Sequence, residues 1–175
     1  MEDKMKRITP LTLILVAMFS AIIFVFTYIG IQVPAFGAFG GLTHLGTLVM
    51  YLIAIKYGKF YGMTSAAIGM TLFDLLSLYA AWAPGTFIIR LIAGYIFGLV
   101  AESPQGQGGS LTKNVMSLLA GGLVIVVGYL VFEALIFNNF ITASASIPGN
   151  ILQIVIASIG LFVIKSMPEL PKTMS

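Results

Sequence analysis

Long apolar stretches, separated by short polar or glycine-containing connections, run along this chain. The stretches are continuous and do not alternate with a period of two, so the pattern is not that of a transmembrane barrel. A segment that crosses a bilayer must satisfy its own backbone hydrogen bonds, which favours helices. The pattern therefore predicts an all-α polytopic membrane protein, a single integral-membrane domain over residues 1–175 with six transmembrane helices. The predicted spans are about 11–31, 44–56, 59–80, 86–101, 114–139 and 148–166.

Composition supports a membrane protein. Apolar residues make up 59% of the chain and charged residues 9%, whereas a soluble domain carries about 25% charged residues. The chain has no cysteine, which excludes disulfides, thiol catalysis and thiolate metal sites. The first apolar stretch resembles a signal peptide, but it is about 20 residues long and lacks a clear cleavage site, so we expect it to be a retained span.

The basic residues predict the orientation. Eight of the nine Lys and Arg residues fall in the two tails and in two short connections between spans: Lys4, Lys6, Arg7, Lys56, Lys59, Lys113, Lys165 and Lys172. With six spans these segments all lie on one side of the membrane, and the positive-inside rule makes that side cytoplasmic. Both termini are then cytoplasmic, and we expect a multi-pass protein of the bacterial plasma membrane. The short basic cluster near the N-terminus anchors the chain, and no nucleic-acid partner is expected.

The connection over residues 32–43 is unusual because it is rich in Gly and Pro but otherwise apolar and uncharged. It contains Phe36 and Phe39, which are poorly suited to water. We expect it to fold back over the outer face as a lid; the alternative is an interfacial loop anchored by its aromatic rings.

Strongly polar residues gather near the predicted outer ends of the spans. Glu133 lies six residues before Asn139, about 9 Å along a helix, and Arg90, Asp74 and His44 fall at similar depths. The inner halves of the spans are almost purely apolar, unlike a channel, which needs polar groups along its length. The pattern predicts a cup open to the outside. The candidate substrate-binding residues are Phe36, His44, Asp74, Tyr79, Trp82, Arg90, Glu133, Asn150 and Gln153.

Several of these residues have structural alternatives. Asp74 and Arg90 could form a buried ion pair that only orders the bundle. His44 and Asn150 could serve as local helix caps. Tyr79 and Trp82 could belong to an aromatic belt at the membrane interface, or could form a stacking wall for a flat ring.

Motifs for catalysis are absent from the sequence. There is no Walker A motif, so the chain cannot hydrolyse ATP itself. One histidine and no spaced metal ligands make a metal site improbable, and no Ser-His-Asp arrangement is compelling. We therefore expect neither an enzyme nor a cofactor or metal.

Two helices carry small residues four positions apart, Ala17 and Ala21 in the first span and Gly94 and Gly98 in the fourth. Such spacing lets helix backbones approach closely in lipid. Either pair could serve packing within the chain or docking of a partner.

These features together resemble the S component of an energy-coupling factor (ECF) vitamin transporter: six spans, an apolar lid after the first span, no ATPase, and Ala17-x-x-x-Ala21. The segment from Gly41 through Asp74 and Trp82 to Arg90 is similar to S components of the hydroxymethylpyrimidine and riboflavin type. The resemblance implies docking through Ala17 and Ala21 on a transmembrane coupling subunit. It also implies two cytoplasmic ATPase subunits, and release of the vitamin inside after the S component topples in the membrane.

The sequence thus predicts a high-affinity vitamin-binding subunit, with hydroxymethylpyrimidine or pyridoxine ranked first and riboflavin or pantothenate next. Two rivals remain open. One is a small proton-coupled secondary transporter that uses Asp74 or Glu133 as a relay. The other is a structural or assembly protein of the membrane.

Overall fold

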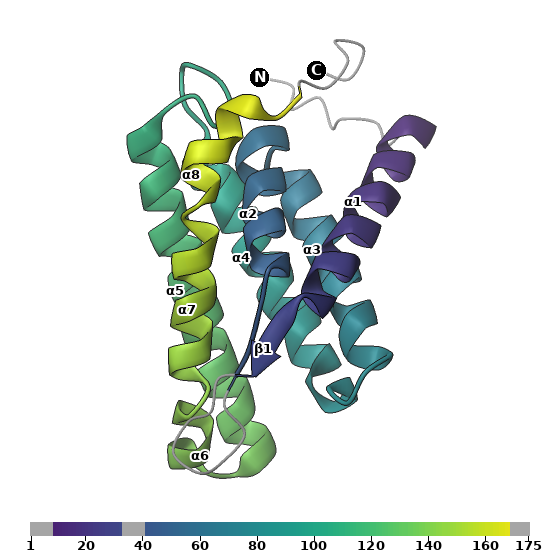
Figure 1. The fold of residues 1–175 in the computed structure, drawn as a ribbon, viewed down its shortest axis with the longest axis vertical. Coiled ribbons are helices and arrows are strands. Elements are labelled where there is room, and N and C mark those ends of the chain that lie inside the picture. The colour runs from purple at the N-terminus through teal and green to yellow at the C-terminus, as the bar shows by residue number, and fades with distance from the viewer. Residues whose placement is uncertain (1–8, 33–40, 169–175) are drawn as a thin grey trace, which may run out of the picture.

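The computed structural model describes residues 9–32 and 41–168. They form a helical bundle with one short β-hairpin (Figure 1). The longer helices are α1 Pro10–Tyr28, α2 Gly46–Tyr57, α3 Lys59–Leu75, α4 Ala83–Ala101, α5 Leu111–Phe137 and α7 Ile147–Ala157. The short elements are β1 Gly30–Gln32, β2 Leu42–His44, η1 Ala80–Trp82, α6 Phe140–Ser144, α8 Gly160–Val163 and η2 Ile164–Ser166.

Capping side chains explain where several helices begin. The hydroxyl of Thr9 accepts the backbone N–H of Thr12 ahead of α1, and that of Ser110 accepts the N–H of Lys113 ahead of α5. Each bond satisfies one of the N–H groups that a helix start leaves unpaired. Helix α5 ends because Asn138 adopts the left-handed conformation, with φ 48°.

Helix α4 lies between α3 and α5, and α1 packs mainly against α3 and α2. In Figure 1, α1 stands on the opposite side of the bundle from α5 and α7. Glycine makes the contact between α3 and α4 close, since a Cβ at Gly94 would lie 2.7 Å from the backbone of Gly62. The buried core includes Tyr51 and Phe97, whose rings meet edge to face.

The structure is mostly helical, as predicted, but it contains a short hairpin that the all-α prediction lacks. Strands β1 and β2 pair antiparallel, with Gly30 opposite His44, so the first helix ends at Tyr28 and not near 31. The expected lid over residues 32–43 starts and finishes in this hairpin, and its residues 33–40 lie outside the described part of the chain. A Cβ at Gly30 would sit 2.7 Å from the carbonyl oxygen of Thr43. Glycine therefore permits this close pairing.

Other predicted boundaries also shift. Helix α2 begins at Gly46, after His44 has completed β2. Helix α3 ends at Leu75 and not at 80, and α4 begins at Ala83 and not at 86. The last predicted span, 148–166, is not one regular helix but α7, α8 and η2 in succession.

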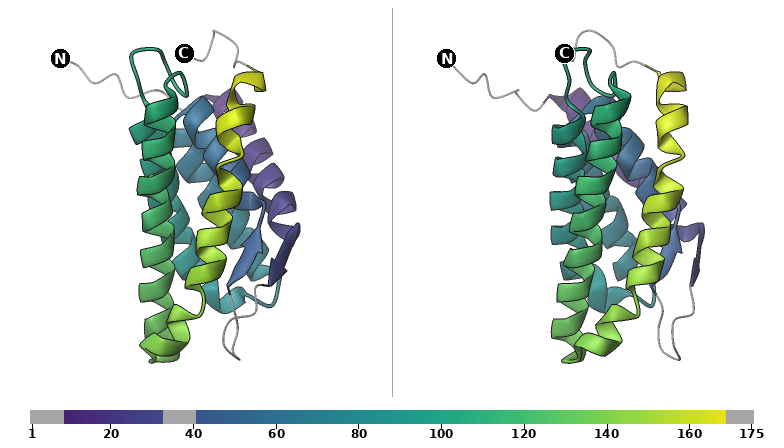
Figure 2. Two further views of the ribbon diagram at one scale, coloured as in Figure 1. Left: turned by 60° about the vertical axis from the view of Figure 1, so that its left-hand side comes forward. Right: turned by 90° about the vertical axis from the view of Figure 1, so that its left-hand side faces the viewer.

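Four segments of the described chain are long and apolar enough to cross a membrane: Pro10–Tyr28, Ala80–Ala101, Leu111–Phe137 and Phe140–Ser166. Helix α2 is apolar but has only 12 residues, and α3 has 17. The six-span count and the cytoplasmic orientation therefore stay predictions. The turn after α2, the loop after α4 and η2 lie at one end of the bundle (Figures 1 and 2). Lys56, Lys59, Lys113 and Lys165 accordingly share that end.

Candidate functional site

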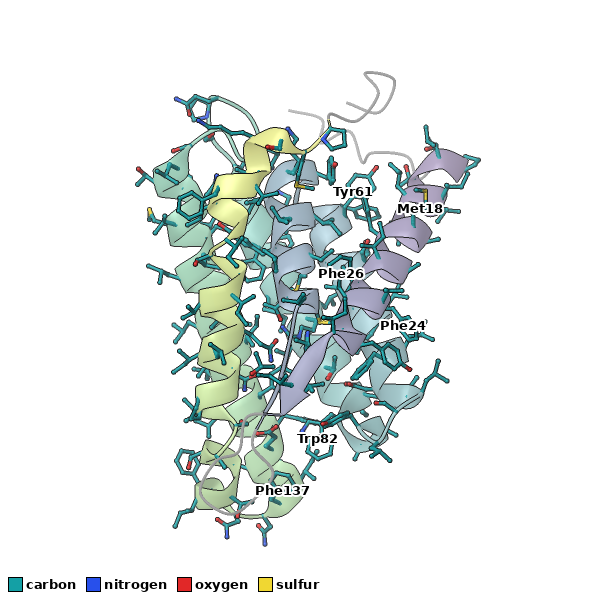
Figure 3. All side chains as sticks on the ribbon, in the orientation of Figure 1. Met18, Phe24, Phe26, Tyr61, Trp82 and Phe137 are labelled. Atoms are coloured by element: carbon teal, nitrogen blue, oxygen red, sulfur yellow. The ribbon has the colours of Figure 1, made fainter. Side chains whose placement is uncertain are left out.

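A cavity with polar walls lies toward the other end of the bundle. Figure 3 labels two of its residues, Trp82 and Phe137, at that end, and Met18 and Tyr61 away from it. Its volume of about 80 Å³ is several times the space that one buried water needs. It can therefore hold more than a single structural water. The cavity is lined by Gly41, Leu42, His44, Asp74, Tyr79, Trp82, Thr86, Arg90, Tyr129, Glu133, Phe137, Ser146, Asn150 and Gln153.

Arg90 is held from three sides by neutral oxygen atoms. It is 1% exposed, and its Nε donates to the Tyr129 hydroxyl at 3.3 Å. Its other two nitrogens donate to Thr47 Oγ1 at 3.1 Å and to Gln153 Oε1 at 3.3 Å. Its guanidinium also lies 5.2 Å from the centre of the Tyr129 ring, a cation–π distance. Arg90 thus ties α4 to α2, α5 and α7.

Gln153 extends this network to the hairpin. Its Oε1 accepts from both Thr47 and Arg90, while its Nε2 donates to the Leu42 carbonyl at 2.6 Å. Thr43 adds a second tie, donating to the Gly149 carbonyl at 3.1 Å. These bonds fix β2 against the first two turns of α7, so one network positions both the cavity wall and the hairpin.

Glu133 and Trp82 form a second polar pair across the cavity. The indole Nε1 of Trp82 donates to Glu133 Oε1 at 2.9 Å. The indole ring also meets the rings of Tyr79 and Phe137 edge to face, each at 5.9 Å between centroids. A carboxylate and an aromatic wall therefore stand side by side, as expected for a site that takes a ring with polar edges.

Asp74 does not form an ion pair with Arg90, one of the alternatives that the sequence left open. No salt bridge joins them among the described residues, and each guanidinium nitrogen donates to a neutral oxygen. Asp74, Thr86 and Arg90 instead line the same cavity. The interpretation of Asp74 and Arg90 as a buried ion pair is wrong.

The structure also decides two of the capping alternatives. The residue before α7 is Ser146, so Asn150 lies one turn inside the helix and is not its cap. Leu45 precedes α2 without a side-chain cap bond, so His44 does not cap it either. His44 and Asn150 both line the cavity instead. Phe36 lies outside the described residues.

Sequence reasoning missed four polar residues of this site: Thr47, Thr86, Tyr129 and Ser146. Their hydroxyl groups are common in membrane helices, and nothing in the composition distinguishes them. Only Tyr129 gives a usable signal, because it precedes Glu133 by four residues and so shares its helix face. The roles of all predicted site residues in substrate binding stay predictions.

An apolar groove of about 540 Å³ lies elsewhere, between α1 and α3. Its walls are Leu13, Val16, Ala17, Ser20, Ala21, Phe24, Ile68 and Leu72. Ala17 and Ala21 are exposed, whereas the face of α1 that packs on the bundle presents Ser20, Ile23 and Thr27. The two alanines therefore do not serve internal packing in this structure.

This chain is similar to proteins of a known family. A family model described as "ECF-type riboflavin transporter, S component" matches residues 7–167. The chain belongs to this family. This match confirms the family predicted from the sequence. An S component is the substrate-binding, multi-pass membrane subunit of an ECF-type vitamin transporter and is not an enzyme.

Two individual proteins are also similar. The structure titled "Structure and mechanism of the S component of a bacterial ECF transporter" superposes with a TM-score of 0.62 and 23% identity, over 88% of this chain and 93% of that one. This likeness concerns the fold. A Pyrococcus woesei protein described as "Uncharacterized protein in gap 3'region" is 29% identical over 89 residues, covering 51% of this S component and 57% of that protein. The match thus spans little more than half the length of this relative.

Proposed function

We propose that this S component captures a small water-soluble vitamin or vitamin precursor in the polar cavity. Hydroxymethylpyrimidine or pyridoxine is the first candidate, and riboflavin, which the family's name carries, and pantothenate come next. The observation that carries the proposal is the pairing of Glu133 with Trp82 beside the buried Arg90 network, in a chain that is otherwise apolar. Such convergence of a few polar groups on one cavity is typical of a ligand site.

The cavity residues divide naturally into two roles. Glu133 and Asn150 hydrogen-bond the polar edges of the ligand, while Trp82 and Tyr79 cover a ring face, with Phe36 predicted to add to this wall. The side-chain amide of Gln153 already forms hydrogen bonds with Thr47, Arg90 and Leu42. Gln153 therefore contacts the ligand only through its remaining hydrogen-bonding capacity. His44, Asp74 and Arg90 complete the wall.

Transport itself needs partner subunits. We infer that Ala17 and Ala21 dock on a transmembrane coupling subunit, with two cytoplasmic ATPases supplying the energy and toppling of the S component releasing the vitamin inside. The exposed alanines in an apolar groove support this docking, because small residues allow close helix approach in lipid.

The direct test is ligand binding by the purified chain. Native mass spectrometry of the freshly purified protein should show a retained small molecule, and one member of a panel of water-soluble vitamins and precursors should bind and raise the Tm. Failure of the whole panel, together with no retained molecule, would overturn the proposal. Uptake by the chain alone in liposomes along a proton gradient would instead support a proton-coupled transporter.

A further inference from the structure

Two carboxylate oxygens in the cavity wall lack a hydrogen-bond donor among the described residues. Asp74 Oδ2 and Glu133 Oε2 are buried and have no hydrogen-bond partner within the described chain. The side chains are 7% and 6% exposed, and both residues line the cavity. A buried carboxylate oxygen without a donor carries a desolvation cost that a bound donor would offset.

Several donors in the same wall already make hydrogen bonds within the chain. Each guanidinium nitrogen of Arg90 donates to a protein oxygen. Gln153 Nε2 donates to Leu42, and Trp82 Nε1 donates to Glu133. A ligand rich in acceptors would therefore compete with these bonds, whereas a ligand rich in donors would meet the two carboxylate oxygens that have no partner in the described part of the chain.

The formal charges of the cavity wall also favour a ligand rich in hydrogen-bond donors. Two carboxylates, Asp74 and Glu133, face a single guanidinium, Arg90, and that guanidinium is already engaged with the Tyr129 ring and three oxygens. With His44 neutral, the lining carries a formal charge of −1 from these three groups. In a low-dielectric site this imbalance favours a cation over an anion.

We propose that the ligand of this cavity carries a protonated amine or an amino-substituted, N–H-donating heteroaromatic ring, which Glu133 and Asp74 bind. The rings of Trp82 and Tyr79 beside Glu133 add a cation–π surface for such a group. Arg90 acts as a positioning residue that holds the cavity wall in place and does not bind an anionic group of the ligand. This inference rests on the proposed function and narrows its substrate class: amino-bearing compounds precede anionic ones such as pantothenate.

A panel of ligands of known charge tests this on the unaltered protein. Pyridoxamine, pyridoxine and 4-pyridoxic acid share a ring and differ by an aminomethyl, hydroxymethyl or carboxylate group. Thiamine and hydroxymethylpyrimidine add amino-bearing members, riboflavin an amine-free one, and pantothenate and biotin anionic ones. We expect the tightest binder to bear an amino group and to exceed its matched anion by about tenfold or more.

The outcomes separate the two proposals. Tightest binding by an anionic or amine-free vitamin would overturn the inference and leave the vitamin-binding function intact. If nothing in the panel binds and no molecule is retained on purification, the proposed function fails, and the inference fails with it.

Isosteric variants then test whether Glu133 and Asp74 bind the amino group of the ligand. Glu133→Gln and Asp74→Asn should each weaken the amino-bearing ligand about tenfold, while matched anions bind equally or better. Glu102→Gln, which removes an exposed carboxylate at the opposite end, is the control. The ratio of amine to anion affinity within one preparation does not depend on the folded fraction, so partial misfolding does not mask the result. An unchanged ratio in both variants would contradict the inference.

Discussion

Two pairs of small residues with the same spacing have opposite environments in this protein. Gly94 and Gly98 of α4 are buried where the helix crosses α3, and a Cβ at Gly98 would lie 2.2 Å from the backbone nitrogen of Lys59. Ala17 and Ala21 of α1 are exposed and line the apolar groove. The sequence left internal packing and partner docking open for each pair, and the structure distinguishes them.

The spacing of small residues marks a helix face, and the element that packs beside that face decides how it is used. The glycines allow the backbones of α3 and α4 to touch, since any side chain would fill that contact. The alanines present a shallow surface that nothing in the described chain covers. One pair is thus a requirement of the fold, and the other is available to a second helix.

The largest effect should come from filling the buried contact. Gly98→Leu would drive a side chain into the backbone of Lys59, so we expect little or no folded protein. The measurement is the monodisperse fraction after detergent extraction and size-exclusion chromatography. Ala21→Leu, the matched change on the exposed pair, should give a normal yield; equal losses would contradict the distinction.

A bulky side chain on the exposed pair should affect transport only. Ala17→Trp should reduce uptake by the assembled transporter about tenfold or more, because a few unfavourable kcal/mol at a close helix contact suffice. Ligand affinity of the isolated subunit should stay unchanged. Ile22→Trp, on another exposed face of α1, is the control, and loss of ligand binding in Ala17→Trp would point to an internal role.

A single methyl group offers a finer test. Gly94→Ala should lower the free energy of unfolding by about 1–3 kcal/mol, because the added Cβ would lie 2.7 Å from Gly62 and force a backbone shift. Ala17→Leu should change it by about 0.5 kcal/mol or less. Thermal melting in one detergent compares them, and a destabilised Ala17→Leu would show that the groove is not free.

Among changes at the α3–α4 contact, the smallest effect should come from its ion pair. Lys59 Nζ lies 3.8 Å from a Glu102 carboxylate oxygen, with both side chains about half exposed. Solvent screens such pairs, so Glu102→Gln should change stability by about 1 kcal/mol or less. If its Tm falls as far as that of Gly94→Ala, charge and not close backbone packing holds these helices together.

The charged residues of the site could be predicted from the sequence because charges are rare in this chain. Asp74, Arg90 and Glu133 stand out in apolar spans, and each lines the cavity. Their partners were not readable: Arg90 binds Thr47, Tyr129 and Gln153, not Asp74. Hydroxyl and amide groups are common in membrane helices, and only the packing of α2, α5 and α7 brings these ones to the guanidinium.

The amino-acid sequence was enough to predict a helical membrane protein, the gathering of its polar residues at one end, and its family. The helical membrane fold and the polar end follow from composition and periodicity, since burial in lipid constrains every span in the same way. The family followed from a resemblance in architecture and motifs. The β-hairpin could not be predicted in this way. Nor could the partners of Arg90, the unsatisfied carboxylate oxygens or the separate environments of the two small-residue pairs. Each of these depends on contacts between residues far apart in the chain, which local pattern does not encode.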